Sequence, residues 1–419
     1  MVAAANFVTG ASPDVSVRFR LAVLVSHFIQ YHVPLFRALA AHPQIDLTVF
    51  VCREWGAATY VDPGFGLSLR WDRSLTDGYR WELLPNWSPR PHSPVWGAVN
   101  PKIISRVWRG HFQAVWVHGW THITTWLAIV SVLATGTPLL VRGEAHLLSH
   151  SQRLSAWLKR FLLVPVFRRT AGFLSIGRRS SEFYRHFGVP EERIFLTPYA
   201  VDNEFFIEEA RRYAPCRQQL KTDLGLNPAL PVILFSGKLI ARKRPFDVLA
   251  ALEILGPVAS VVFLGDGELR ASLESVSRRI KNVHFAGFKN QTELPPYFAL
   301  ADVFVLPSAY EPWGLVLNEA MCFGLPVIAS DGVGATADLI EHGVNGFIYK
   351  AGDIGSLAQC LRQVVSDPAA RARMGQTSRE KIESWSYSKD VEGVVRCLQS
   401  VATQSATRLG SQSHSRRTP

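Results

Sequence analysis

Short apolar runs alternate with longer segments of helical periodicity along almost the whole chain of 419 residues. Residues 21–26 (LAVLVS) have the character of a buried strand, and residues 33–42 (VPLFRALAAH) have the spacing of a helix. Strands that are apolar throughout are typical of parallel sheets covered by helices on both faces. The alternation therefore predicts an α/β fold built from repeated strand–helix units.

The strand-like runs fall into two series, which suits two domains that each bury a core. The first series continues with residues 47–52, 114–119, 138–143 and 172–177, and the second comprises residues 232–237, 260–265, 283–287, 303–308, 326–330 and 346–350. A polar stretch separates them, so we place the boundary within residues 198–230. Residues 56–100 are rich in Pro, Gly and Trp and predict loops or a short hairpin.

The net charge of +11 favours anionic partners such as nucleotides or phospholipid surfaces, although a solvated basic surface explains it equally well. The sequence has no zinc-finger spacing and no aromatic RNA-binding signature, so we expect no nucleic acid partner. Five scattered cysteines without a C-x-x-C pair fit a reducing compartment. The first twenty residues lack the pattern of a signal peptide. These features predict a cytoplasmic protein.

Two apolar segments raise the question of a membrane. Residues 110–141 contain no Asp, Glu, Lys or Arg, but His118, His122 and a Gly-Thr-Pro sequence interrupt them, which favours a buried strand, helix and strand over a membrane span. Residues 155–173 mix apolar and basic side chains, and Pro165 is expected to break their helix. This segment fits peripheral contact with an anionic membrane at its inner face, or packing against the N-terminal sheet.

A basic loop follows the apolar run at 232–237. Lys238, Arg242 and Lys243 lie in this loop, and Pro245 suits the first turn of a helix, where its missing N–H costs nothing. Free N–H groups at a helix start, flanked by cations, attract an anion such as a diphosphate. The alternative interpretation is a solvated basic loop.

A second loop follows the run at 303–308 and leads into a helix that carries two acids. Glu311 lies in the loop, Gly314 lies near the helix start, and Glu319 lies within the helix. Glycine allows a ligand to approach the backbone, and carboxylates accept hydrogen bonds from sugar hydroxyls. The alternative is a helix-capping acid and a surface acid. The spacing does not suit the acid pair of a glycosidase.

Together these motifs resemble the retaining GT-B glycosyltransferases of family four, over about residues 20–395. The match consists of the phosphate loop (FSGKLIARKRP), the E-x7-E motif from Glu311 to Glu319, and the segments FLGDGELR and TADLIEHGVNGFIYKAGD. The resemblance implies two Rossmann-like, doubly wound parallel-sheet domains facing a cleft. It implies an acceptor domain at 20–205, a donor domain at 206–384 and a helix at 385–400 that crosses back. We expect a flexible N-terminus at 1–19 and a disordered basic tail at 401–419.

The resemblance also implies roles for the donor half. Lys238 and Lys243 bind the diphosphate of a nucleotide sugar, Glu319 accepts hydrogen bonds from the ribose, and Glu311 binds hydroxyls of the transferred sugar as a catalytic residue. The remaining donor-binding residues are Arg242, Gly314, Leu315 and Val316. The family retains anomeric configuration without a bound metal, so no metal and no cofactor is expected.

The acceptor half departs from the family pattern. A family histidine after the run at 138–143 is replaced by Glu144, with His146 two residues on, and either side chain can serve the acceptor. The glycine pair after the first strand is replaced by SHFIQYHVPLF. The candidates for shaping the acceptor site are His27, Gln30, Tyr31, His32 and His118. The pairs His118/His122 and His146/His150 have the spacing of zinc ligands but no evident third ligand.

The predicted activity is transfer of a sugar from a nucleotide diphosphate sugar to a hydroxyl of a glycan or lipid-linked acceptor, in glycan or surface polysaccharide biosynthesis. Two alternatives stay open. One is another enzyme on the same fold, a nucleotide-sugar epimerase or a phosphorylase. The other is a non-catalytic sugar or nucleotide binder. A nicotinamide site is rejected because Arg270 stands where the dinucleotide fingerprint requires Gly or Ala.

Overall fold

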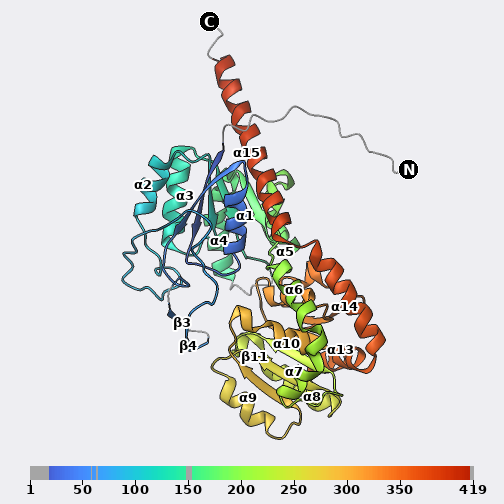
Figure 1. The fold of residues 1–419 in the computed structure, drawn as a ribbon. Helices are drawn as coiled ribbons and strands as arrows, with labels where there is room; N and C mark the ends of the chain where they lie inside the picture. The colour runs from blue at the N-terminus through green and yellow to red at the C-terminus, as the bar shows by residue number, and fades with distance from the viewer. Residues whose placement is uncertain (1–17, 58, 63–64, 148–152, 416–419) are drawn as a thin grey trace, which may run out of the picture.

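A computed structural model describes residues 18–57, 59–62, 65–147 and 153–415 (Figure 1). The N-terminal domain is built on a seven-stranded sheet in which every neighbouring pair is parallel, in the order β5-β2-β1-β6-β7-β8-β9. Its strands are β1 (Phe19–Val25), β2 (Ile45–Val51), β5 (Trp81–Leu83), β6 (Ala114–His118), β7 (Leu139–Arg142), β8 (Gly172–Ser175) and β9 (Ile194–Leu196). Between β2 and β5, strands β3 (Tyr60–Asp62) and β4 (Leu67–Leu69) form an antiparallel hairpin.

Helices cover both faces of this sheet because successive strand residues point to opposite sides and both sides are apolar. One face packs against α1 (Val33–Ala41) and α15 (Tyr387–Ser415). The other face packs against α2 (Lys102–Gly110), α3 (Ile123–Thr135), α4 (Arg153–Arg169) and α5 (Arg178–His186).

The C-terminal domain has a six-stranded parallel sheet in the order β12-β11-β10-β13-β14-β15. The strands are β10 (Val232–Ser236), β11 (Ser260–Leu264), β12 (Val283–Gly287), β13 (Val303–Leu306), β14 (Val327–Ser330) and β15 (Gly346–Tyr349). One face is covered by α6 (Asn203–Tyr213), α7 (Arg217–Asp223), α10 (Pro295–Leu300), α11 (Leu315–Cys322), α12 (Thr336–Leu339) and α14 (Pro368–Glu383). The other is covered by α8 (Pro245–Leu255), α9 (Arg270–Ser277) and α13 (Ile354–Ser366). Short 3-10 turns occur at η1 (Glu191–Arg193), η2 (Ala214–Cys216), η3 (Ala241–Lys243) and η4 (Gln291–Glu293).

Both sheets have the strand order of a doubly wound fold, in which the chain starts at a central strand, moves to one edge and returns to complete the other side. The reversal lies between β1 and β6 in the first sheet and between β10 and β13 in the second. The prediction of two Rossmann-like parallel-sheet domains is confirmed. Ligands of such sheets bind beyond the carboxyl ends of the strands that flank the reversal, which directs attention to four loops.

The chain changes domain shortly after β9. Helix α6 already packs on the C-terminal core through Phe206, so the changeover lies at residues 197–202, slightly before the predicted limit at 205. At its other end the chain returns, and α15 runs along the N-terminal domain (Figure 1). Val394, Cys397 and Leu398 of this helix are buried in the N-terminal core. The N-terminal domain is therefore completed by residues from the end of the sequence.

Three predictions about local structure need correction. Pro165 does not break α4, because Leu163 and Phe167 anchor the helix on the sheet while Pro165 lies on its exposed side, where the unbonded carbonyl can meet water. The tail predicted to be disordered is helical over 401–415, since α15 propagates from its packed first half. The region 56–100 contributes the edge strand β5 as well as a hairpin. Of the predicted flexible N-terminus, residues 1–17 lie outside the described residues, and Phe19 already belongs to β1.

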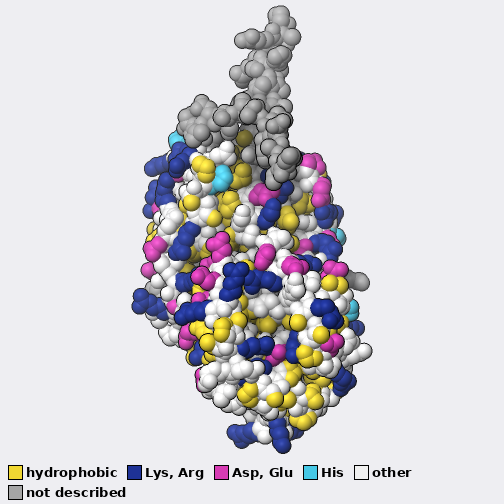
Figure 2. Space-filling model, turned by 45° about the vertical axis from the view of Figure 1, so that its right-hand side comes forward, with side chains coloured by type: hydrophobic (Ala, Val, Ile, Leu, Met, Phe, Trp, Pro, Cys, Tyr) yellow, Lys and Arg dark blue, Asp and Glu magenta, His cyan; other side chains and the backbone are white. Residues whose placement is uncertain are grey.

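The charge-free segment at 110–141 forms β6, α3 and β7, which is the arrangement of strand, helix and strand expected for it. In the described part of the chain, no helix combines the length and apolar character needed to cross a bilayer. On the face drawn in Figure 2, Lys and Arg side chains are scattered over both domains among Asp and Glu side chains. The positive charge on that face is therefore not gathered into one continuous stripe.

Candidate active site

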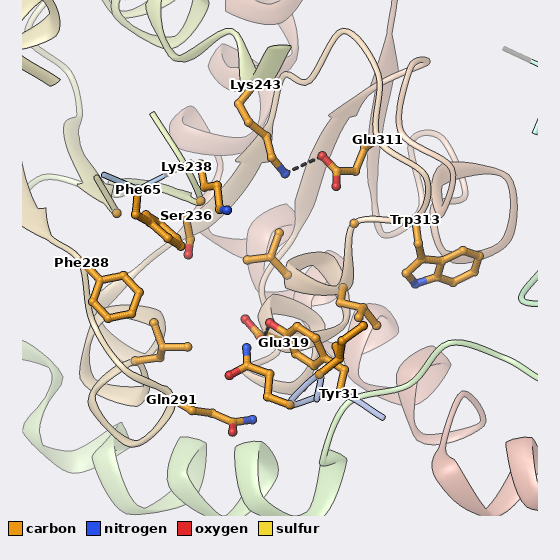
Figure 3. A pocket seen from close by; sticks show the side chains of 18 of the residues that line it. Tyr31, Phe65, Ser236, Lys238, Lys243, Phe288, Gln291, Glu311, Trp313 and Glu319 are labelled. Carbon is orange, nitrogen blue, oxygen red and sulfur yellow. Dashed lines mark hydrogen bonds and ion pairs between the residues drawn. The ribbon is translucent and has the colours of Figure 1, made fainter. Parts of the chain in front are cut away.

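The loops at the two strand reversals face each other across a cavity of about 440 Å³. The N-terminal domain contributes the loop after β1, Glu144 after β7, and the hairpin region that carries Phe65 and Trp71. The C-terminal domain contributes the loops after β10 and β13 and the start of α11. Figure 3 shows side chains from both domains directed toward this space. The cavity therefore lies where the fold predicts a ligand site.

The loop after β10 delivers three cations to the cavity. The Lys243 side chain is almost fully buried, and its Nζ lies 2.5 Å from Oε2 of Glu311 (Figure 3). Arg242 Nη1 lies 3.1 Å from the same oxygen and donates to the carbonyl of Tyr310 at 2.6 Å. Burial lowers the pKa of Lys243, although the Glu311 carboxylate favours its charged form. Two cations thus share one carboxylate, which leaves positive charge available to an anion.

The Lys238 side chain lies on the side of Lys243 away from Glu311, next to a group of aromatic rings (Figure 3). Its Nζ is 4.8 Å from the ring centroid of Phe65, which comes from the N-terminal domain. The Phe65 ring packs edge-on against Phe288 of the C-terminal domain, with 4.9 Å between the ring centroids. The Trp71 ring centroid lies 6.4 Å from that of Phe288. These rings bridge the two domains above the cationic loop. No site residue was predicted among these rings; Phe65 and Trp71 lie in residues 56–100, whose composition predicts loops or a short hairpin without indicating a ligand.

The start of α11 presents backbone donors to the cavity. Gly314 precedes the helix with φ of +101°, and a Cβ there would lie 3.0 Å from Leu306 Cδ2 and 3.1 Å from Val333 Cγ1, which explains the glycine. Leu315 and Val316 line the cavity, and no described side chain caps this helix end. Its first N–H groups are therefore available to an anionic ligand.

Glu319, one turn into α11, joins the two domains at the bottom of the cavity. Its side chain is buried, and Tyr31 Oη of the loop after β1 donates to its Oε1 at 2.9 Å. Burial raises the pKa of Glu319 to about 7, while the Tyr31 hydrogen bond favours the carboxylate. Burial also raises the pKa of Tyr31 well above its ordinary value. Tyr31, predicted for the acceptor site, thus contacts a residue predicted for the donor site.

A polar cluster on the N-terminal side surrounds the hydroxyl of Tyr199. This hydroxyl donates to Glu144 Oε1 at 2.5 Å and lies 2.9 Å from His118 Nε2 and 3.5 Å from His32 Nε2. Burial lowers the pKa of both histidines, which keeps their rings neutral. Burial opposes ionisation of Glu144, but the nearby His118, with its Nε2 3.9 Å from Oε1, and the hydrogen bond from Tyr199 outweigh burial and lower the pKa of Glu144. Glu144 is consequently held as an oriented carboxylate at the cavity wall.

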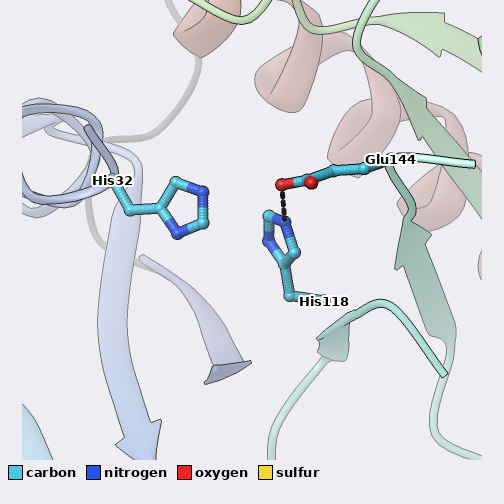
Figure 4. A group of neighbouring side chains, drawn as sticks. All are labelled: His32, His118 and Glu144. Carbon is cyan, nitrogen blue, oxygen red and sulfur yellow. Dashed lines mark ion pairs between the residues drawn. The ribbon is translucent and has the colours of Figure 1, made fainter. Parts of the chain in front are cut away.

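The same cluster is the one group among the described residues whose ligand atoms could hold a metal ion. Atoms of His32, His118 and Glu144 all lie within 4.8 Å of one another (Figure 4). Of the pair His118/His122, only His118 belongs to this group, and its two neighbours there, His32 and Glu144, were not predicted as metal ligands. His122 is not part of this group; its Nε2 lies 3.4 Å from Nη2 of Arg53. His150 lies outside the described residues.

An ion pair supports this cluster from below. Arg142 Nη2 lies 2.8 Å from Asp390 Oδ2 of α15 and donates to the carbonyl of Thr197 at 2.9 Å. Both charged side chains are almost fully buried. The guanidinium carbon lies 4.7 Å from the ring centroid of Tyr199. Burial raises the pKa of Asp390 to about 6, although Arg142 favours the charged form. The pair links α15 to the residue that orients Glu144.

The remaining predicted residues divide into two groups. His27 and Gln30 line the cavity, and His27 Nδ1 lies 2.8 Å from Ser26 Oγ. His146 and His118 do not line it. His146 is buried with its Nε2 3.2 Å from the carbonyl of Glu311 and its ring 4.7 Å from that of Tyr310. Of the two candidates for the acceptor, Glu144 faces the cavity and His146 supports a loop of the other domain.

Residues 217–381 match the family model of glycosyl transferases group 1. The chain is 26% identical over 305 residues to the sulfoquinovosyl transferase of Arabidopsis thaliana, an alignment that covers 70% of this chain and 58% of the relative. It is 28% identical over 262 residues to the alpha-D-kanosaminyltransferase of Streptomyces kanamyceticus, covering 58% of this chain and 65% of the relative. The alignments therefore span less than two thirds of these relatives.

Solved structures match over nearly the whole chain. HepE of Anabaena in complex with UDP-glucose superposes with a TM-score of 0.66 at 17% sequence identity, covering 93% of this chain and all of that one. At this identity the likeness establishes the fold. Most of the C-terminal domain thus matches the glycosyl transferases group 1 family, and the whole chain has the two-domain GT-B fold.

Proposed function

We propose that this protein is a retaining glycosyltransferase that moves a sugar from a nucleoside diphosphate sugar to a hydroxyl of an acceptor. The observation that carries the proposal is the interdomain cavity, which has Lys238, Arg242 and Lys243 along one side and the buried Glu319 at its bottom. Cations and a hydrogen-bond acceptor at these places suit the diphosphate and the ribose of one nucleotide. The family match of residues 217–381 supports the same assignment.

In this proposal the donor diphosphate lies between the basic loop and the start of α11. Lys238 and Lys243 neutralise the charge that develops as the diphosphate departs, and the N–H groups of Leu315 and Val316 add fixed dipoles. Glu319 accepts hydrogen bonds from the ribose. Because the diphosphate competes for Lys243, Glu311 is released to accept hydrogen bonds from the transferred sugar.

The acceptor hydroxyl lies on the N-terminal side, where Glu144 accepts its hydrogen bond. Its oxygen forms a bond to the anomeric carbon on the face from which the diphosphate leaves, the bond from that carbon to the phosphate oxygen breaks, and the acceptor proton passes to a phosphate oxygen. This front-face route retains the anomeric configuration. It involves no covalent enzyme intermediate, and the proposal assigns it no metal and no other cofactor.

We propose a glycan or a lipid-linked saccharide as the acceptor, in the biosynthesis of a glycan or surface polysaccharide in the cytoplasm. Two solved neighbours of the same fold hold UDP or UDP-glucose. UDP-sugars are therefore the first donors to test, followed by GDP- and ADP-sugars.

The test begins with a thermal-shift screen of these donors, since a ligand that binds the folded state raises its apparent stability. A labelled donor that binds is then incubated with saccharide acceptors, and the anomeric configuration of the product is read by NMR. A product with retained configuration supports the proposal. Epimerised donor or free sugar phosphate favours the epimerase or phosphorylase alternative. Binding without turnover on every acceptor favours a non-catalytic binder.

A further inference from the structure

The outer side of the N-terminal domain carries an apolar groove between α2 and α3. Its volume is about 450 Å³, and its lining is almost free of polar groups. The residues that form its walls include Ile104 and Trp108 of α2 and Trp126, Leu127, Val130 and Ala134 of α3. Figure 1 shows the two helices side by side on the side of the domain away from α15. The groove is separate from the interdomain cavity.

Large apolar side chains on the rims of the groove are unusually exposed to solvent. Val130 is 64% exposed and Trp108 is 58% exposed. The apolar surface continues into the loop before α2, where Trp96 is 50% exposed and Val95 accepts a backbone hydrogen bond from Ile123 at the start of α3. Isolated exposed apolar residues are common, but a contiguous set is typical of an interaction surface.

Three of the four helices on this face of the sheet share a charge pattern; the fourth, α5, carries the exposed Glu182. Neither α2, α3 nor α4 contains a single Asp or Glu. Their described basic side chains are Lys102, Arg106 and Arg109 of α2 and Arg160, Arg168 and Arg169 of α4. We call the outer surface of these three helices the acid-free face.

The carboxylate paired with α2 does not cancel the positive charge of this surface. Glu82 of β5 lies 3.2 Å from Lys102 and 2.8 Å from Arg106, so a single acid serves two cations. Arg109 has no ion pair with a described carboxylate. On α4, Phe161 is 65% exposed beside the exposed Arg160. Exposed apolar and basic side chains thus occur together on three helices that themselves carry no Asp or Glu.

This combination fits one kind of occupant. Trp and aliphatic side chains favour the boundary between headgroups and acyl chains, and arginines on the same surface are attracted by anionic headgroups. We propose that the acid-free face binds the surface of an anionic lipid bilayer, with Trp108 and Val130 inserted and Arg109 against the headgroups. The proposal does not depend on the proposed function, since it uses no residue of the interdomain cavity.

The experiment is flotation of the full-length protein with vesicles of phosphatidylcholine alone or of phosphatidylcholine with an equal part of phosphatidylglycerol. We expect flotation with the mixed vesicles and a loss of binding at high salt. The double variant Trp108→Ser/Val130→Ser should bind the mixed vesicles at least about tenfold more weakly than the unmodified protein, because two inserted apolar side chains are lost. Arg109→Gln should weaken binding only to the mixed vesicles.

The matched control is Ile254→Ser, which removes an apolar side chain of similar exposure (52%) from α8 in the other domain. It should float like the unmodified protein. Unchanged thermal unfolding of each variant shows that the fold is intact. The proposal is overturned if the unmodified protein does not float with the mixed vesicles or if the double variant floats equally well. It is also overturned if the double variant instead abolishes a dimer seen by light scattering, which would assign this face to a second copy of the chain.

Discussion

The pair formed by Lys243 and Glu311 allows a quantitative test of the donor site. Both side chains are largely buried, at 11% and 14% exposure, and Nζ lies 2.5 Å from the carboxylate. Loss of one partner from a buried pair costs about 3–5 kcal/mol. Arg242 stays within 3.1 Å of the same oxygen, so we expect Lys243→Met to lower the free energy of unfolding by about 2 kcal/mol. The double variant Lys243→Met/Glu311→Gln should lose less unfolding free energy than the two single variants together, by about 1–2 kcal/mol.

Donor binding gives the second half of this prediction. A hydrogen bond from an ammonium group to a diphosphate is worth about 1.5–3 kcal/mol, so Lys243→Met should weaken nucleotide-sugar binding about 10- to 150-fold. Glu311→Gln should have the opposite or no effect on binding, because the carboxylate no longer competes with the diphosphate for Lys243. Its turnover should nevertheless fall, since the amide binds the transferred sugar less well.

The assays are urea unfolding for stability and titration calorimetry for binding, with Lys281→Met as the control. Lys281 is an exposed lysine of the same domain that does not line the cavity. Unaltered donor affinity in Lys243→Met would refute the assignment of the diphosphate to this loop. Strictly additive unfolding free energies in the double variant would refute the energetic coupling of the two side chains.

Three further predictions follow from the buried titrating groups. Because Glu319 has a pKa of about 7 in the folded protein and an ordinary value of 4.5, nucleotide-sugar affinity should rise as pH rises through 7. Since the folded state holds this proton more tightly than the unfolded chain, the contribution of Glu319 to the free energy of unfolding should fall as pH rises from about 4.5 to about 7 and stay constant above that; Glu319→Gln should remove both trends in calorimetry and urea unfolding. Glu144→Gln should lower kcat with little change in donor affinity, and Tyr199→Phe should move the acidic limb of the kcat profile to higher pH, since it removes a hydrogen bond that lowers the pKa of Glu144; equal profiles would contradict this. Asp390→Asn should cost about 3–5 kcal/mol in urea unfolding because it leaves Arg142 buried without its partner; a loss below about 1 kcal/mol would contradict a buried pair.

The fold could be predicted because its signal is local and repeated. Apolar runs such as residues 232–236 and the helices between them each show their own period, and two series of such units allow few arrangements other than two doubly wound sheets. Glycine and basic residues after the run at 232–236, and Glu311 and Gly314 after the run at 303–308, indicated the strand-to-helix loops. Parallel strands bring these loops to one edge, so Lys238, Lys243 and Glu319 lie around one cavity, as the sequence indicated.

The contacts between domains could not be predicted in this way. Tyr31 and Glu319 are separated by 288 residues, and nothing in either segment indicates their hydrogen bond. Tyr199 follows β9, a strand of three residues that is too short to stand out among the apolar runs of the first series. Phe65 belongs to a hairpin of two three-residue strands, too short to show a period. These residues act through tertiary packing, to which local periodicity is insensitive.

The choice between Glu144 and His146 illustrates the same limit. The two side chains are two residues apart beyond the end of β7, so their spacing alone does not tell which of them faces the ligand. The packing of His146 against Tyr310 favours Glu144, since it places the His146 ring against the other domain. Glu144 then remains as the side chain that reaches the cavity.

The return of α15 to the first domain has a consequence for biosynthesis. A ribosome releases β1, α1 and β8 long before it releases Val394 and Cys397, yet these two side chains fill the face that those elements share. Gly172 of β8 has no room for a side chain, because a Cβ there would lie 2.3 Å from Cys397 Sγ. The nascent first half must therefore keep an uncovered apolar surface until α15 has been synthesised, and a chain cut within residues 384–386 should fold fully only when the missing helix is supplied as a separate peptide.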